Sequence, residues 1–210
     1  MHKVFISYHH DQDQHYKNYL VNIAHVFRLF IDRSVNTGDI NGSLSDERIR
    51  QIIRDEYLRD STVTIVLVGQ QTKHRKHVDW EIYSSMFDGA KNKKSGILVI
   101  NLPGTSELGF VTSSEEKIVV YPDIHPDSCV SVNSRTDYEQ RYPHMPARII
   151  DNLLKPEAKI SVVPWNRIIT LPHYLTYLID AAFKHRRSSQ YDLSRPLRRR
   201  NSNWHNQILR

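Results

Sequence analysis

The sequence predicts an α/β protein with an open parallel sheet and helices on both of its faces. Three short apolar segments are typical of buried strands: 3–8 (KVFISY), 62–69 (TVTIVLVG) and 95–103 (SGILVINLP). Segments in which apolar residues recur at helical spacing lie between them. This alternation of strands and helices predicts parallel strands joined by right-handed crossovers.

The intervening helices are predicted from their apolar stripes and caps. Residues 15–34 carry apolar side chains at helical spacing, and residues 45–61 open with a serine cap and acidic residues. Residues 78–91 form the next predicted helix, which ends near Gly89. Residues 35–43 contain two glycines, which is typical of a turn.

The pattern is weaker in the second half of the chain. Residues 117–122 (KIVVYP) predict a strand, and residues 146–155 and 172–187 predict helices. Much of the rest is rich in Pro, Ser and Asp, so we interpret residues 104–164 as an elaboration of the same domain. The predicted domain therefore covers residues 1–187.

Positive charge is concentrated at the C-terminal end. The formal net charge of the chain is +6, and residues 184–210 hold eight Lys or Arg and one Asp, which leaves the preceding part close to neutral. The net charge of the predicted domain gives no support for nucleic-acid binding. We predict a basic tail over residues 188–210, which could either solubilise the protein or bind nucleic acid.

Composition excludes several kinds of site. The chain of 210 residues has one cysteine, Cys129, so an intrachain disulfide framework and a cysteine-based zinc site are excluded, and a reducing, cytoplasmic location is expected. No apolar run is long enough to span a membrane, so we expect no membrane partner. His74 and His77 lie three residues apart in a basic loop without an evident third ligand, and we predict no metal site.

Open parallel sheets bind ligands beyond the carboxyl ends of their strands. Two loops occupy that place here: Tyr8 and His9 follow the first strand, and Gln70 and Thr72 follow the central one. Neither loop contains the glycine-rich dinucleotide fingerprint, the P-loop or the nucleophile elbow. The loops instead supply imidazole, amide and hydroxyl groups, and His9 could contact a phosphate or face water.

The segments around these loops resemble Toll/interleukin-1 receptor (TIR) domains. Residues 3–13 (KVFISYHHDQD) are similar to the first box of these domains. Residues 60–72 (DSTVTIVLVGQQT), followed by R-x-x-x-x-W-E-I, resemble bacterial TIR-like proteins of the Thoeris anti-phage systems. The resemblance covers about residues 3–102 and implies a TIR/flavodoxin-like fold, elaborated here in the C-terminal half.

The resemblance also implies an activity: cleavage of NAD+ at the nicotinamide–ribose bond, often with cyclisation to a signalling nucleotide. Glu81 takes the position of the catalytic glutamate, and Phe5, Ser7 and Tyr8 take first-strand positions that line the pocket. NAD+ is then a substrate, and no cofactor is expected. The product would act on a separate effector protein, and the protein itself could form a homo-oligomer.

One position departs from the family pattern. The family places a Trp four residues before the glutamate, where this sequence has His77, and Trp80 directly precedes Glu81 instead. We include His77 and Trp80 among the expected substrate-binding residues.

Without the resemblance, the residues favour a solvated Glu81. On a helical wheel Ile82 and Met86 share an apolar face, whereas Glu81 falls with Ser84 and Asp88 on the opposite, polar face. An acidic residue in the first turn of a helix also suits the helix dipole.

Two further functions remain open. A nucleoside deoxyribosyltransferase-like N-glycosidase shares this sheet architecture and also uses a glutamate. A non-catalytic TIR adaptor that works by assembly is the second, and His77 in place of the usual Trp favours it slightly.

Overall fold

A computed structural model describes residues 1–34, 45–90, 92–125 and 130–202. The predicted turn over residues 35–43 and Cys129 lie outside the described residues. No helix among the described residues is long and apolar enough to cross a membrane.

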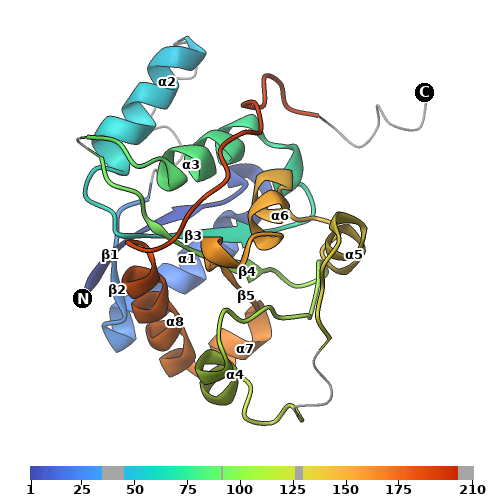
Figure 1. The fold of residues 1–210 in the computed structure, drawn as a ribbon. Coiled ribbons are helices and arrows are strands. Elements are labelled where there is room, and N and C mark those ends of the chain that lie inside the picture. Colours follow the sequence, from blue (N-terminus) through green and yellow to red (C-terminus); the bar gives the residue numbers. More distant parts are fainter. Residues whose placement is uncertain (35–44, 91, 126–129, 203–210) are drawn as a thin grey trace.

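The centre of the fold is a five-stranded, all-parallel sheet, which confirms the predicted class (Figure 1). The strands are β1 (His2–Ser7), β2 (Phe30–Asp32), β3 (Val63–Val68), β4 (Gly96–Asn101) and β5 (Ser161–Pro164). Their order is β2-β1-β3-β4-β5, with Ser7 of β1 paired to Val66 of β3. The strand order reverses between β1 and β3, and this switch point is where ligands bind in sheets of this kind.

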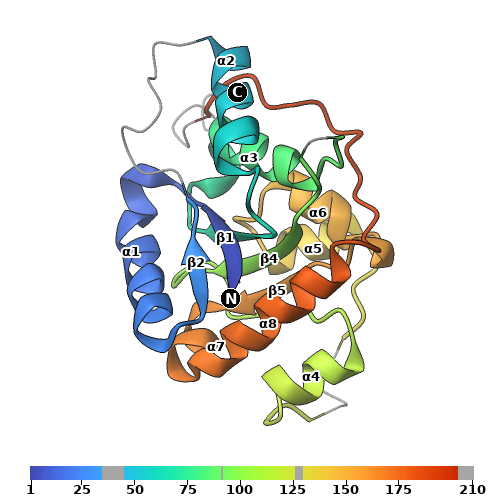
Figure 2. The ribbon, with the colours of Figure 1, turned by 90° about the vertical axis from the view of Figure 1, so that its left-hand side faces the viewer.

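Helices cover both faces of the sheet (Figure 2). They are α1 (His10–Phe27), α2 (Asp46–Ile52) with a π-helical continuation η1 (Ile53–Tyr57), η2 (Thr72–His74), α3 (Lys76–Met86), α4 (Ser114–Val120), α5 (Arg135–Arg141), α6 (Ala147–Leu153), η4 (Pro156–Ala158), α7 (Trp165–Thr170) and α8 (Pro172–His185). Alternate β1 residues face opposite layers, because side chains of a strand point to opposite faces in turn. Val4 and Ile6 pack with α1, α7 and α8, whereas Phe5 packs with α2 and α3.

The first predicted helix is displaced in the structure. Helix α1 begins at His10 and ends at Phe27, and part of the predicted 15–34 helix is instead the edge strand β2. The acidic residues Asp11 and Asp13 in the first turn suit the positive end of a helix. Arg28 takes a left-handed conformation with φ 53°, which ends the helix.

The predicted strand over 117–122 is wrong, because these residues belong largely to helix α4. Ser113 caps this helix by accepting a hydrogen bond from Glu116 N at 3.1 Å. A serine followed three residues later by a glutamate is a helix-start pattern, and here it outweighs the strand preference of two adjacent valines. Strand β5 and helices α5 and α7 were not predicted from the sequence.

The chain beyond α8 packs on the domain. We call residues 189–202 the C-terminal strap. In both views this red segment rises from the end of α8 toward α3 (Figures 1 and 2). Tyr191 Oη donates to Ser95 O at 3.0 Å, and Ser202 N donates to His74 O at 3.1 Å. The division into a domain and a tail stays a prediction, but the described part of the predicted tail does not extend freely into solvent.

Candidate functional site

Ser7 and Glu81 meet at the switch point of the sheet. Ser7 is the last residue of β1, and α3 lies over this face of the sheet. The Ser7 hydroxyl donates to Glu81 Oε2 at 2.6 Å. Glu81 is 5% exposed and Ser7 is fully buried, so the carboxyl group is held in one position.

The polar face that the helical wheel assigns to Glu81 is therefore not a solvated face. The five residues from Val78 to Ile82 are all buried, so this turn of α3 is covered on every side. Strand β1, helix α2 and the C-terminal strap supply the cover. A helical wheel cannot show this, because it assumes that one side of the helix faces solvent.

Burial raises the pKa of Glu81 to about 8, and the hydrogen bond from Ser7 opposes part of the rise. The carboxyl group is therefore mostly protonated at neutral pH when no other charge is near it. A positive charge brought close to Glu81 would favour the ionised form.

Phe5 and Trp80 fix the same part of α3 by packing. They belong to an apolar cluster with Ile49, Ile53 and Leu58. Trp80 Nε1 donates to Arg198 O in the C-terminal strap at 2.9 Å. Both aromatic side chains are buried, so they anchor the turn that carries Glu81.

Three other expected site residues face the other layer of helices or the solvent. Tyr8 faces the other layer of helices, where its hydroxyl donates to Gln14 Oε1 at 2.6 Å. His77 and Gln70 are exposed, and the His77 ring lies 5.2 Å from the Trp80 ring. The structure thus brings Ser7, Phe5 and Trp80 to the turn that carries Glu81, but not Tyr8 or Gln70.

His9 continues the face of β1 that carries Ser7. Its side chain is buried, and neither ring nitrogen has a hydrogen-bond partner among the described residues. The nearest carboxylate, that of the exposed Asp11, lies 3.5 Å from Nε2, at the limit of a hydrogen bond. Burial and, after it, the positive charge of Arg75 lower the pKa of His9, so the ring is neutral at pH 7.

Thr72 joins the two strand-end loops through Asp13, a residue that sequence analysis did not single out. The Thr72 hydroxyl accepts from Gly69 N at 2.8 Å and lies 3.3 Å from Asp13 Oδ2. Burial raises the pKa of Asp13 to about 6. A Cβ atom on Gly69 would lie 2.3 Å from Asp13 Oδ2, so this close approach requires glycine. An acidic residue in the first turn of the helix that follows β1 was the available signal for Asp13.

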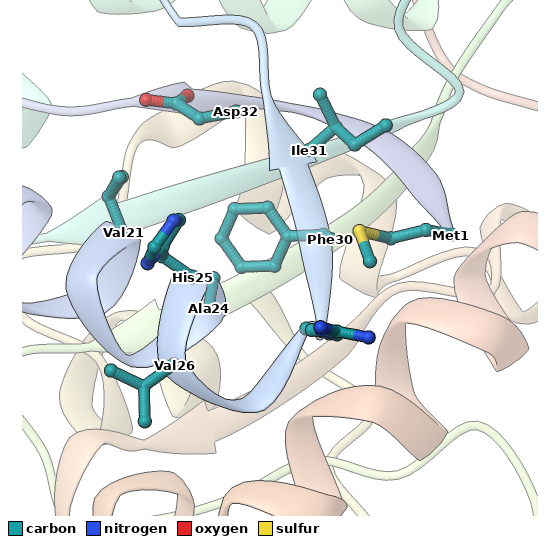
Figure 3. A pocket seen from close by; sticks show the side chains of 9 residues that line it. Met1, Val21, Ala24, His25, Val26, Phe30, Ile31 and Asp32 are labelled. Carbon is teal, nitrogen blue, oxygen red and sulfur yellow. The ribbon is translucent and has the colours of Figure 1, made fainter.

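A pocket of about 910 Å³ lies at the edge strand β2 and the end of α1, away from Glu81 (Figure 3). Its walls are mainly apolar, and its one carboxylate, Asp32, lies 3.1 Å from Lys17 Nζ. None of the strand-end residues above lines it, so it is not part of the candidate site. Across the described residues no group of three or more His, Cys, Asp or Glu is arranged to hold a metal ion.

Comparison with known proteins gives a match over the first half of the chain. Residues 5–107 match the family model described as the TIR-like domain of the Thoeris protein ThsB. The matched segment includes Ser7, Thr72 and Glu81, and it contains the end of β1 and the whole of β2, β3 and β4. No curated protein matches the chain. Residues 5–107 therefore belong to the family of TIR-like domains of the Thoeris protein ThsB.

Proposed function

We propose that the protein cleaves the bond between nicotinamide and ribose in NAD+, with Glu81 as the carboxylate that acts on the ribose. The observation that carries the proposal is the Ser7–Glu81 pair, a buried carboxyl group fixed by a strand-end hydroxyl at 2.6 Å. The pair lies at the switch point of the sheet, where ligands of this architecture bind. The family to which residues 5–107 belong also supports NAD+ cleavage as the activity.

The chemistry of this cleavage asks for one carboxylate. Nicotinamide in NAD+ is already a cationic leaving group, so no general acid has to protonate it. Nicotinamide leaves as a neutral molecule through a transition state with oxocarbenium character, as in glycoside hydrolysis. Water then bonds to C1′ of the ribose and loses a proton, which gives ADP-ribose, or a nucleophilic group of the same molecule bonds there and gives a cyclic derivative. A carboxylate fixed in a site shielded from water stabilises that positive charge more than it would in bulk water.

The high pKa of Glu81 fits this role. The free site holds a neutral carboxyl group and avoids a buried, uncompensated charge. Binding of the positively charged nicotinamide ring favours loss of the proton, so the carboxylate is formed next to the charge that it stabilises. We propose further that the product, ADP-ribose or a cyclic derivative of it, is a signal for a separate effector protein in anti-phage defence, as the Thoeris family suggests.

The test is nicotinamide release and nucleotide analysis with NAD+, for the wild type, Glu81→Gln and the control Glu107→Gln. Glu107 is exposed and lies in the loop after β4. We expect Glu81→Gln to lower the rate by at least about two orders of magnitude, the scale of losing a main electrostatic stabiliser. The control should keep wild-type turnover.

Two further arms separate the alternatives. Incubation with deoxynucleosides tests the N-glycosidase function, and turnover there without NAD+ cleavage would replace our proposal. Nucleotides extracted from cells with and without phage infection test whether activity requires a trigger. A protein that consumes no NAD+ in any arm would support the non-catalytic adaptor.

A further inference from the structure

A second pocket lies where the C-terminal strap crosses the loop between β3 and α3. Its volume is about 290 Å³, and neither Ser7 nor Glu81 lines it. The loop contributes Lys73 and Arg75, the start of α6 contributes Pro146, and the strap contributes residues 195–198. Three segments far apart in the sequence thus form its walls.

Two of the charged side chains that line this pocket, Asp79 and Arg195, are each paired with a residue of opposite charge that does not line it. The Asp79 carboxylate accepts from the Arg148 guanidinium at 2.9 and 3.1 Å. Arg195 Nη2 donates to Asp151 Oδ1 at 3.0 Å. Asp79 is the only carboxylate among the lining residues, and its charge is balanced by the fully buried Arg148.

Three cations then remain without a carboxylate partner among the residues that the structure describes: Lys73, Arg75 and Arg198. The Lys73 ammonium donates to Pro143 O at 2.6 Å, and Arg198 Nη1 donates to Ser202 Oγ at 3.3 Å. Both acceptors are neutral. The pocket therefore carries an excess of positive charge, and walls of one sign of charge concentrate ions of the opposite sign.

Arg75 lines the pocket, and His74 directly precedes it in the sequence without lining the pocket. Arg75 Nε and His74 Nε2 are buried and have no hydrogen-bond partner in the described part of the chain. Burial and the charges of Lys73, Arg198 and Arg75 lower the pKa of His74, which agrees with a cluster of positive charge around it. A buried donor without a partner costs free energy, and an acceptor from a ligand would satisfy it.

We propose that this pocket binds the phosphate or diphosphate group of a nucleotide, held by Lys73, Arg75 and Arg198. A volume of about 290 Å³ is at or below the range of about 300 to 1,000 Å³ that holds whole drug-sized ligands, so the pocket fits one charged group of a larger molecule. Guanidinium groups match phosphate oxygens with paired hydrogen bonds. The ligand is either the diphosphate of NAD+ itself or a separate nucleotide.

Calorimetric titration with inorganic pyrophosphate at low ionic strength tests the pocket without any turnover. The variants are Arg75→Gln and Arg198→Gln, and the matched control is Arg199→Gln, which removes the same charge from an exposed neighbour on the strap. We expect the wild type to bind, and each pocket variant to weaken binding about tenfold or more, on the scale of one charge-assisted hydrogen bond. The control should bind like the wild type.

Thermal melts confirm that each variant is folded. Absence of pyrophosphate binding to the wild type would overturn the proposal. Equal weakening by Arg75→Gln and Arg199→Gln would also overturn it, because it would show attraction to net charge rather than to this pocket.

A second titration identifies the source of the diphosphate. NAD+ is titrated into Glu81→Gln, with and without saturating pyrophosphate. If pyrophosphate displaces NAD+, the pocket holds the diphosphate of the proposed substrate, and this conclusion rests on the proposed function. If NAD+ binds equally well in both, the pocket takes a separate nucleotide. If NAD+ does not bind at all, the proposed function is weakened while the pyrophosphate result stands.

Discussion

At the scale of single residues, burial sets the charge of Glu81. A neutral carboxyl group costs little to bury, whereas an ionised one loses its hydration and gains only the Ser7 hydroxyl in return. The burial that raises the pKa of Glu81 therefore also lowers the stability of the fold at high pH, where the buried carboxyl group ionises.

The stability of the wild type should fall as pH rises. The pKa of Glu81 is about 8 in the folded protein and near 4.5 when unfolded, so the folded state binds the extra proton between these values. Its contribution to stability is complete below about pH 4.5 and is lost as pH rises through about 8. Glu81→Gln lacks this loss, so at pH 9 it should melt roughly 5 to 10 °C above the wild type.

Melting curves at pH 6 and pH 9 check this prediction. The control Glu107→Gln should follow the wild type at both values. A gap between Glu81→Gln and the wild type that does not widen with pH would show that Glu81 is ionised in the folded protein.

Gly69 offers a second test at this scale. In Gly69→Ala the new Cβ would lie 2.3 Å from Asp13 Oδ2, so the buried carboxylate must move away from Thr72. We expect a loss of about 1 to 3 kcal/mol in the free energy of unfolding. In the double variant Gly69→Ala/Asp13→Ala the clash is gone, so its loss should be less than the sum of the two single losses. Additive losses in chemical denaturation would contradict the proposed contact.

At the scale of elements, helix α3 is held from several directions. Asp79 binds the Arg148 guanidinium of α6 and also accepts from Arg198 N of the C-terminal strap at 2.9 Å. Trp80, one residue further, donates to the strap backbone. The turn that carries Glu81 is thus joined to α6 and to the strap.

Asp79→Ala should be strongly destabilising. It leaves the guanidinium of Arg148, which is fully buried, without its carboxylate, and breaking a buried pair in this way costs about 3 to 5 kcal/mol. Asp88→Ala is the control, because Asp88 is exposed and its nearest ammonium lies 3.9 Å away. The control should cost at most about 1 kcal/mol. Equal losses in urea denaturation would mean that the Asp79–Arg148 pair does not hold α3.

At the scale of the whole molecule, the C-terminal strap is part of the folded unit. Truncation after Ser202 removes none of the contacts described above, whereas truncation after Ser188 removes Arg198, Tyr191 and the apolar contact of Leu197 with the cluster around Trp80. We expect the longer chain to melt like the full protein and the shorter chain to remain folded but to melt roughly 5 °C or more below it. Indistinguishable melting of the two would show that the strap adds nothing to stability.

The sheet was predictable and much of the site was not, for physical reasons. The strands β3 and β4 are nearly continuous apolar runs and β1 has an apolar centre, and such patterns arise from local composition. Strand β2 has three residues, too few for a pattern. Only the resemblance to TIR domains singled out Glu81 as a site residue, since the helical wheel alone favoured a solvated side chain. Its burial depends on Ser7 and on the C-terminal strap, which are distant in sequence, and no local pattern encodes that contact.

The central claim is that the Glu81 carboxylate stabilises charge on the ribose of NAD+. The most direct measurement is the pH profile of nicotinamide release by the wild type and by Glu81→Gln. The ionised form is the active one, so kcat/KM of the wild type should rise with pH and level off above about 8, because this ratio reports the free protein. The profile of kcat should rise at lower pH, since the bound cation favours the carboxylate. At pH 8 and above, Glu81→Gln should be slower by at least about two orders of magnitude, and the gap in kcat/KM should narrow as pH falls, because protonation of Glu81 already slows the wild type. Wild-type turnover in a folded Glu81→Gln protein, or a wild-type kcat/KM that falls as pH rises toward 8, would contradict the claim.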